Sequence, residues 1–207
     1  MYSMKAFFDR YSYECVRLLL NQIAISMFGF ALAMTAVKAE SDTLLLWTSI
    51  ASICFYLALI YGTAWKVGSG DRLSIQYGKI PYRPFRGLVL SLIANSVNFL
   101  LAVLITLGFF CGAPILEDIP SAIALLSQGM YMGLLTVVKI GGTPLNDIWW
   151  VFFLLPLPAM LTSLVAYIAG AKDVHITKMG IPELPESDRP TRKELREQKE
   201  LEKRGKK

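Results

Sequence analysis

Uncharged polar residues recur on one face of the third long apolar segment of this sequence. Ser91, Asn95 and Asn98 are four and three residues apart, and these steps return an α-helix to nearly the same side. Such a face can form hydrogen bonds between helices, or it can line a cavity for a neutral solute. Gln22, from an earlier apolar segment, could complete it. The sequence therefore predicts a polar helix face formed by Ser91, Asn95, Asn98 and Gln22, with both roles open.

Catalysis would require a nucleophile, an acid–base pair or a metal cluster. The single histidine, His175, lies in the charged C-terminal region, where Asp173 is its nearest acidic neighbour and one such pair makes no metal site. Cys15, Cys54 and Cys111 lie far apart and form no Cys-x-x-Cys pair. We therefore expect no enzyme, no metal, no cofactor and inert thiols.

A connector between apolar segments, residues 66–86, alternates basic with aromatic side chains. Its basic residues are Lys66, Arg72, Lys79, Arg83 and Arg86. Each Lys or Arg beside an anionic membrane surface contributes about 1 kcal/mol to the attraction, so we predict a headgroup-binding loop. Asp71 and Arg72 could instead contact a phosphate, although ordinary surface charge explains them equally well. The Pro81-x-x-Pro84 step could bind an SH3-like groove if the connector projected from the membrane.

These side chains lie in or beside segments that are too apolar for an ordinary soluble domain. Of the 207 residues, 54% are hydrophobic and only 18% are charged, and the mean hydropathy is +0.47. A helix of about twenty apolar residues crosses the hydrocarbon core of a bilayer. Residues 18–37, 44–65, 88–111 and 148–170 are segments of this kind without a charged side chain. We therefore predict an all-α fold, a polytopic membrane helix bundle with four transmembrane helices. Pro156 and Pro158 form a candidate kink in the last span.

A fifth segment, residues 119–138, is long enough to cross but contains more polar residues and glycines. Asp118 could cap a helix there, with Pro120 in its first turn. Gly129 and Gly133 form a Gly-x-x-x-Gly pattern, which favours close helix packing. We predict an outer helix that lies in the membrane interface or re-enters the bundle, and the alternative is a fifth span.

Basic residues gather on one side of the predicted spans. Three precede the first span and five lie in the connector after the second, whereas the intervening hairpin carries one lysine and two acids. The positive-inside rule then places both termini on the cytoplasmic side of the cell membrane, although five spans would export the C-terminus. Residues 1–17 would form a cytoplasmic amphipathic helix, residues 18–170 the transmembrane helix bundle and residues 171–207 a cytoplasmic charged tail.

Short motifs in the connector and the last span carry a resemblance. They are Tyr77-Gly78-Lys79-Ile80 with Gly87, and Leu154-Leu155-Pro156-Leu157-Pro158 leading to Tyr167-Ile168-Ala169-Gly170-Ala171-Lys172. Over about residues 44 to 180 the chain resembles a loose group of small uncharacterised four-span bacterial integral membrane proteins. The resemblance implies an outer connecting segment before the last span and brings no assigned activity.

The sequence favours a non-enzymatic accessory or interaction subunit of a membrane assembly. Its partners would be membrane lipids and a membrane protein or a second copy of the chain, with no nucleic acid, because anionic headgroups lie nearest to the basic residues. The alternative is a small transporter or channel that passes a neutral or apolar solute along the polar helix face.

Overall fold

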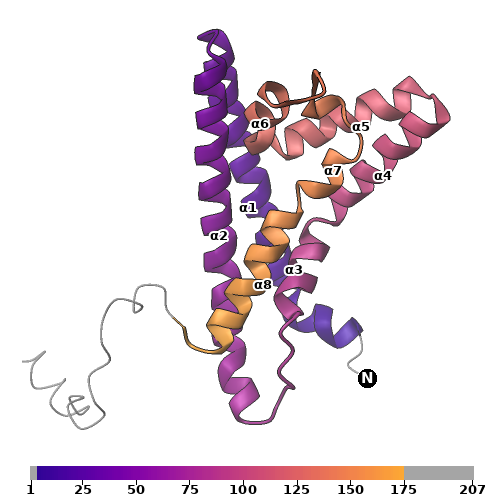
Figure 1. Ribbon diagram of the computed structural model, residues 1–207. Helices are drawn as coiled ribbons and strands as arrows, with labels where there is room; N and C mark the ends of the chain where they lie inside the picture. Colours follow the sequence, from indigo (N-terminus) through magenta and orange to yellow (C-terminus); the bar gives the residue numbers. More distant parts are fainter. Residues whose placement is uncertain (1–3, 175–207) are drawn as a thin grey trace, which may run out of the picture. The chain divides into compact units, whose positions relative to one another are not determined.

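The computed structural model describes residues 4–174 of the chain. Within this part, residues up to Asp173 form one compact unit. His175 and the predicted charged tail from that residue onward lie outside the described residues. Figure 1 shows that the compact unit is built almost entirely from helices, which pack along and across one another.

Two long antiparallel helices form the longest elements of the unit (Figure 1). Helices α1 (Met4–Lys38) and α2 (Asp42–Gln76) have 35 residues each. A helix of this length extends about 52 Å, well beyond the roughly 30 Å of hydrocarbon that it would cross. The predicted N-terminal helix continues without a break into the first predicted span, and both belong to α1. Its residues Tyr11 and Cys15 are buried inside the bundle.

The third predicted span is bent. It consists of α3 (Arg86–Ala94) and α4 (Ser96–Cys111), which meet at Asn95 with an angle of 59° between them. The Asn95 side chain donates a hydrogen bond to the carbonyl oxygen of Ser91 at 2.9 Å. The backbone amide of Asn95 donates to the same oxygen at 2.9 Å, so the Ser91 carbonyl accepts two hydrogen bonds next to the bend.

The predicted outer segment is bent more sharply and begins earlier than the sequence suggested. Helix α5 (Pro114–Ser127) starts at Pro114 instead of following an Asp118 cap, and Pro120 lies inside it. The 3-10 helix η1 (Gly129–Tyr131) and α6 (Met132–Val137) follow, and the two parts enclose an angle of 88°. Proline fits the first turn of a helix because the amide hydrogens there have no helical partner, so Pro114 was the correct start signal.

A small hairpin and the last span complete the described chain. Strands β1 (Lys139–Ile140) and β2 (Thr143–Pro144) pair antiparallel, with Ile140 opposite Thr143. After the 3-10 helix η2 (Leu145–Asp147), α7 (Val151–Leu154) and α8 (Leu157–Ala171) together form one candidate span of 21 residues. The helix is interrupted at Leu155 and Pro156, and Pro156 belongs to the proline pair that predicted a kink.

The described residues contain three helices that are long and apolar enough to cross a membrane, with α7 and α8 counted as one, and up to five spans if each bent pair crosses. The prediction of an all-α membrane helix bundle is therefore confirmed. The predicted number of four spans lies within this range.

Close helix contacts depend on glycine at both ends of the bundle. Helices α2 and α8 cross at Gly68 and Gly170, where a Cβ atom would overlap the carbonyl oxygens of Tyr167 and Trp65. At the opposite end, a Cβ on Gly129 would lie 2.6 Å from the carbonyl oxygen of Ser26. The Gly-x-x-x-Gly pattern thus packs within the chain, with its first glycine against α1.

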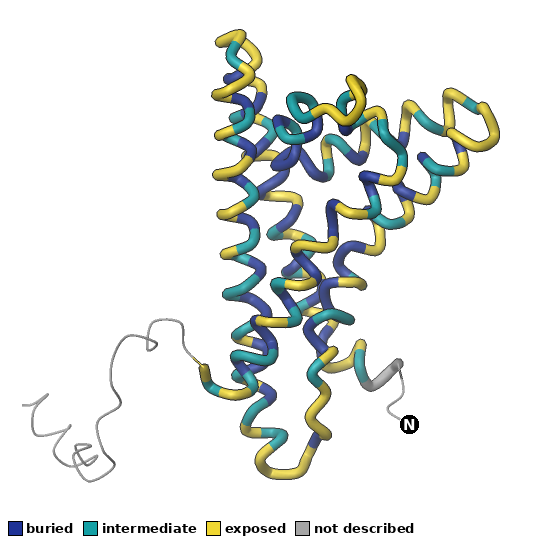
Figure 2. The backbone as a smooth tube through the Cα atoms, viewed as in Figure 1, coloured by how far each residue is buried: buried dark blue, intermediate teal, exposed yellow. Residues whose placement is uncertain are grey.

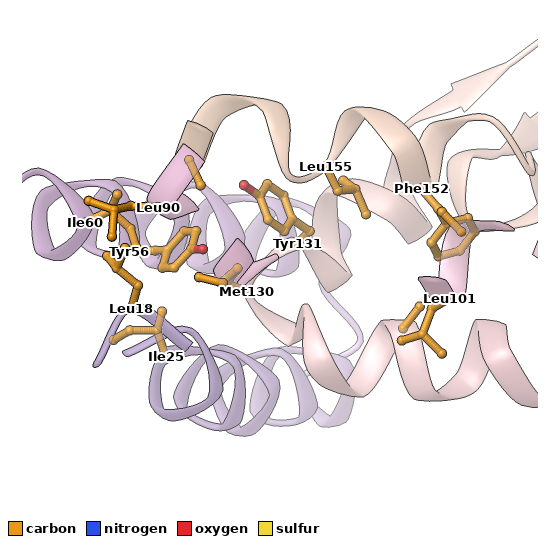
Figure 3. Close-up of a cluster of buried hydrophobic side chains, with 14 of the residues drawn as sticks. Leu18, Ile25, Tyr56, Ile60, Leu90, Leu101, Met130, Tyr131, Phe152 and Leu155 are labelled. Atoms are coloured by element: carbon orange, nitrogen blue, oxygen red, sulfur yellow. The ribbon is translucent and has the colours of Figure 1, made fainter. Parts of the chain in front are cut away.

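Figure 2 shows the buried positions concentrated where the helices adjoin, and Figure 3 shows part of the apolar core.

Candidate functional site

The predicted polar helix face lies inside the bundle. Ser91, Asn95, Asn98 and Gln22 are all buried, with exposed fractions of 1 to 4%. Asn98 donates to the Oδ1 atom of Asn95 at 2.9 Å, and Asn95 donates to the hydroxyl oxygen of Ser91 at 3.3 Å. The three side chains of α3 and α4 therefore form a continuous hydrogen-bonded chain that faces protein.

This chain of hydrogen bonds reaches the bend after α5. Ser127, the last residue of α5, donates to the Oδ1 atom of Asn98 at 3.2 Å. Its carbonyl oxygen accepts from the Nε2 atom of Gln22 at 3.5 Å, a long hydrogen bond. The structure thus brings Gln22 to the polar face through Ser127, a residue that the sequence did not single out.

A serine of α1 holds the same bend from the other side. The Ser26 hydroxyl donates to the carbonyl oxygen of Leu126 and accepts from the backbone amide of Gly129 at 2.7 Å. Backbone groups released by a break inside a membrane need such partners, because lipid offers none.

Three buried polar atoms around this bend have no hydrogen-bond partner among the described residues. They are the Oε1 atom of Gln22, the Nε2 atom of Gln128 and the hydroxyl of Tyr131. A buried polar group without a partner costs about 1 to 3 kcal/mol. We call the set Gln22, Asn95, Asn98, Ser127, Gln128 and Tyr131 the polar centre. It can offer both donors and acceptors to a small neutral molecule.

The hydroxyl of Tyr131 points toward that of Tyr56 on α2 (Figure 3). Both side chains are buried, at 4% and 1% exposed, and Asn95 lies next to Tyr56. Tyr131 also borders a groove of about 290 Å³ near the break between α7 and α8. The other residues that line it are Leu134, Ile140, Leu145, Trp150, Val151, Leu154, Leu155 and Pro158. We call this the outer groove. Tyr131 therefore separates an apolar groove from the polar centre.

A second cluster lies at the opposite end of the bundle, where α1 begins and α8 ends, which we call the inner end. Asp71 of α2 is only 3% exposed. Its Oδ2 atom accepts from Tyr11 at 2.7 Å, from Arg86 at 2.8 Å and from Tyr167 at 2.9 Å. Its Oδ1 atom accepts from Arg10 at 3.0 Å. We call these five residues the Asp71 clasp, and they join α1, α2, α3 and α8.

The clasp corrects the interpretation of Asp71 and adds buried protein partners to the predicted role of Arg86. Asp71 is not a surface charge or a phosphate contact. Arg86, which was grouped with the headgroup-binding loop, is 5% exposed and donates to Asp71, to Tyr167 at 3.0 Å and to the carbonyl oxygen of Pro81 at 3.2 Å. The sequence concealed this because an Asp and an Arg 15 residues apart look like ordinary connector charges.

The other basic residues of the connector lie nearer the surface. Lys66, Lys79 and Arg83 are exposed. Arg72 forms an ion pair with Asp173 just after α8, and both side chains are partly exposed, at 35% and 37%. These four residues remain candidates for contact with headgroups.

Comparisons with family models, curated proteins and solved structures find no match to this chain, so no relative indicates what either cluster does. Within residues 4–174, no three His, Cys, Asp or Glu side chains lie close enough to hold a metal ion. The cysteines of this part are free, with Cys15 buried and Cys54 and Cys111 exposed. The chemistry available at the polar centre is therefore hydrogen bonding.

Proposed function

We propose that this chain is a multi-pass protein of the cell membrane, not an enzyme, that passes a small neutral solute through the polar centre. The observation that carries the proposal is the group of three buried polar atoms without a partner, on Gln22, Gln128 and Tyr131. These atoms lie at a bend between helices, and membrane transporters commonly bind solutes where their helices are interrupted. A neutral solute fits because the polar centre contains amides and hydroxyls but no charged side chain.

The surroundings of the polar centre support the same proposal. Two bent helix pairs meet there, through the hydrogen bond between Ser127 and Asn98. The outer groove reaches Tyr131, so a solute entering between α6 and α7 would meet this residue first. A polar face that pointed toward lipid could not have lined a path for a solute through the bundle. Its place inside the bundle favours transport over the accessory subunit that the sequence favoured.

Replacing Tyr131 with phenylalanine should lower transport without weakening the fold. The hydroxyl that this change removes has no partner among the described residues, so its loss is expected to leave stability unchanged or raise it by about 1 kcal/mol. Swelling of vesicles that contain the purified protein, with glycerol and urea as solutes, should show the loss as at least a tenfold slower influx. Asn98→Leu should abolish influx, because it removes the hydrogen bonds of Asn98 to Asn95 and Ser127.

The matched control is Thr106→Val in α4. The Thr106 hydroxyl donates to the carbonyl oxygen of Ala102 in its own helix at 2.8 Å, so its removal should not change influx. Influx through Tyr131→Phe at the rate of the unmodified protein would count against transport. If the unmodified protein passes neither solute but crosslinks to a stoichiometric companion, the role of an accessory subunit would be favoured instead.

We also propose that the inner end faces the cytoplasm. The proposal rests on the basic residues that the connector and the start of α1 place there. The test adds Lys79→Cys or Gly141→Cys to a variant without the native cysteines. In intact cells, the thiol of Lys79→Cys should resist a membrane-impermeant reagent, whereas that of Gly141→Cys, in the β1–β2 turn, should react. Labelling at position 79 and protection at position 141 would show that the chain has the opposite orientation.

A further inference from the structure

A cavity beside the Asp71 clasp combines apolar walls with cationic side chains. Its volume is about 380 Å³, and it is lined by Phe7 of α1, by residues 82–85 of the connector, and by Arg86 and Val89 of α3. It lies apart from the polar centre, at the inner end of the bundle. Neither the clasp nor the proposed transport of a solute explains its shape.

The two kinds of lining residue suit the two parts of an amphiphile. Phe7, Pro84, Phe85 and Val89 form a surface that can hold a hydrocarbon chain. Arg83 is exposed at the same cavity, and the buried Arg86 contributes a second guanidinium. A guanidinium has five N–H donors, and the clasp and Pro81 use three of those on Arg86, so two remain for a phosphate.

The charge at this end of the bundle also favours an anion. In the clasp, two guanidinium groups, of Arg10 and Arg86, share the single carboxylate of Asp71, which leaves a net charge of +1. Arg83 adds a further positive charge at the cavity. Arginine binds phosphate well because its planar donors match the phosphate oxygens.

The position along the helices matches the headgroup layer. The apolar part of α2 ends near Trp65, and Asp71 follows six residues later, which is about 9 Å farther along a helix. The headgroup region of a bilayer extends several ångströms beyond the hydrocarbon on each side. We therefore expect the clasp and the adjoining cavity near the level of the lipid headgroups.

We propose that this cavity binds one anionic phospholipid, with an acyl chain against Phe7, Phe85 and Val89 and the phosphate beside Arg83 and Arg86. The occupant is a lipid instead of free phosphate because most of the lining is apolar. The site differs from a generally basic surface in that it needs both the cavity and a cation at its rim.

Native mass spectrometry of the purified full-length chain tests the proposal. After exchange into micelles with equal amounts of phosphatidylglycerol and phosphatidylcholine, the unmodified protein should retain phosphatidylglycerol preferentially. One cation near an anionic headgroup corresponds to about a fivefold change in affinity, so Arg83→Glu should reduce the preference at least fivefold. Val89→Trp, which fills the cavity, should reduce the retention of both lipids. Added inorganic phosphate should displace neither.

Lys79→Glu is the matched control, because it makes the same charge change at an exposed position of the same connector outside the cavity lining. It should leave the preference within twofold of that of the unmodified protein. Equal effects of Arg83→Glu and Lys79→Glu would overturn the proposal in favour of general surface charge, as would equal retention of both lipids by the unmodified protein. Displacement of the lipid by inorganic phosphate would also overturn it. The comparison does not depend on Val89→Trp folding, since both charge changes alter exposed side chains.

Discussion

Asp71→Asn is expected to lower the free energy of unfolding by about 3 to 5 kcal/mol, the usual cost of removing one partner from a buried ion pair. The guanidinium of Arg86 would stay buried beside a neutral amide, and the hydroxyls of Tyr11 and Tyr167 would lose a charged acceptor. Denaturant unfolding of the purified protein in mild detergent, followed by helical circular dichroism, would measure the change. Because four helices meet at Asp71, the variant should also unfold less cooperatively.

Asp173→Asn provides the control, since the ion pair between Asp173 and Arg72 is more than one-third exposed and should contribute at most about 1 kcal/mol. Adding Arg86→Met to Asp71→Asn should cost little further, because the two side chains stabilise the fold as a pair. If Asp71→Asn and Asp173→Asn cost the same, the Asp71 clasp does not hold the inner end together.

Gly68→Ala is expected to destabilise the fold by about 3 kcal/mol, at the upper end of the usual range for overpacking. The new methyl group would overlap the carbonyl oxygen of Tyr167 on α8, and a backbone atom cannot move aside as a flexible side chain can. Helices α2 and α8 would therefore have to separate, which would also loosen the contact between Asp71 and Tyr167. Thermal unfolding in the same detergent would detect the loss.

Helix α2 supplies its own controls. A Cβ atom on Gly62 or on Gly70 would have no atom within 4 Å, so Gly62→Ala and Gly70→Ala should leave stability unchanged or raise it by up to about 1 kcal/mol through helix propensity. Gly170→Ala should resemble Gly68→Ala, and the double variant should cost less than the sum because both changes open one crossing. Three alanine variants of α2 with equal stability would show that α2 and α8 do not cross at Gly68.

The long apolar segments predicted the helices well because lipid leaves a chain of twenty apolar residues few alternatives to a helix. The bends were harder to predict. Asn95 was predicted to be part of a polar helix face, which it is, but the spacing of the polar residues did not show that the helix breaks at this position. One residue therefore both belongs to the face and marks the bend between α3 and α4.

The residues of the candidate sites were also predictable only in part. Ser91, Asn95 and Asn98 share a face by local helix periodicity, which a sequence shows directly. Gln128 and Tyr131 were missed because only the fold places them beside that face. The Asp71 clasp was missed because its members come from four helices, and Tyr11 and Tyr167 are separated from Asp71 by 60 and 96 residues. The resemblance to small four-span bacterial proteins stays a prediction.

The order of the clasp residues along the chain has a consequence for biosynthesis. A ribosome releases Tyr11, Asp71 and Arg86 long before Tyr167, which lies near the end of the last span. Until that helix inserts, the carboxylate and the guanidinium have only part of their final set of hydrogen bonds. An incomplete chain thus holds Asp71 and Arg86 with fewer partners, and insertion of the last helix completes the set.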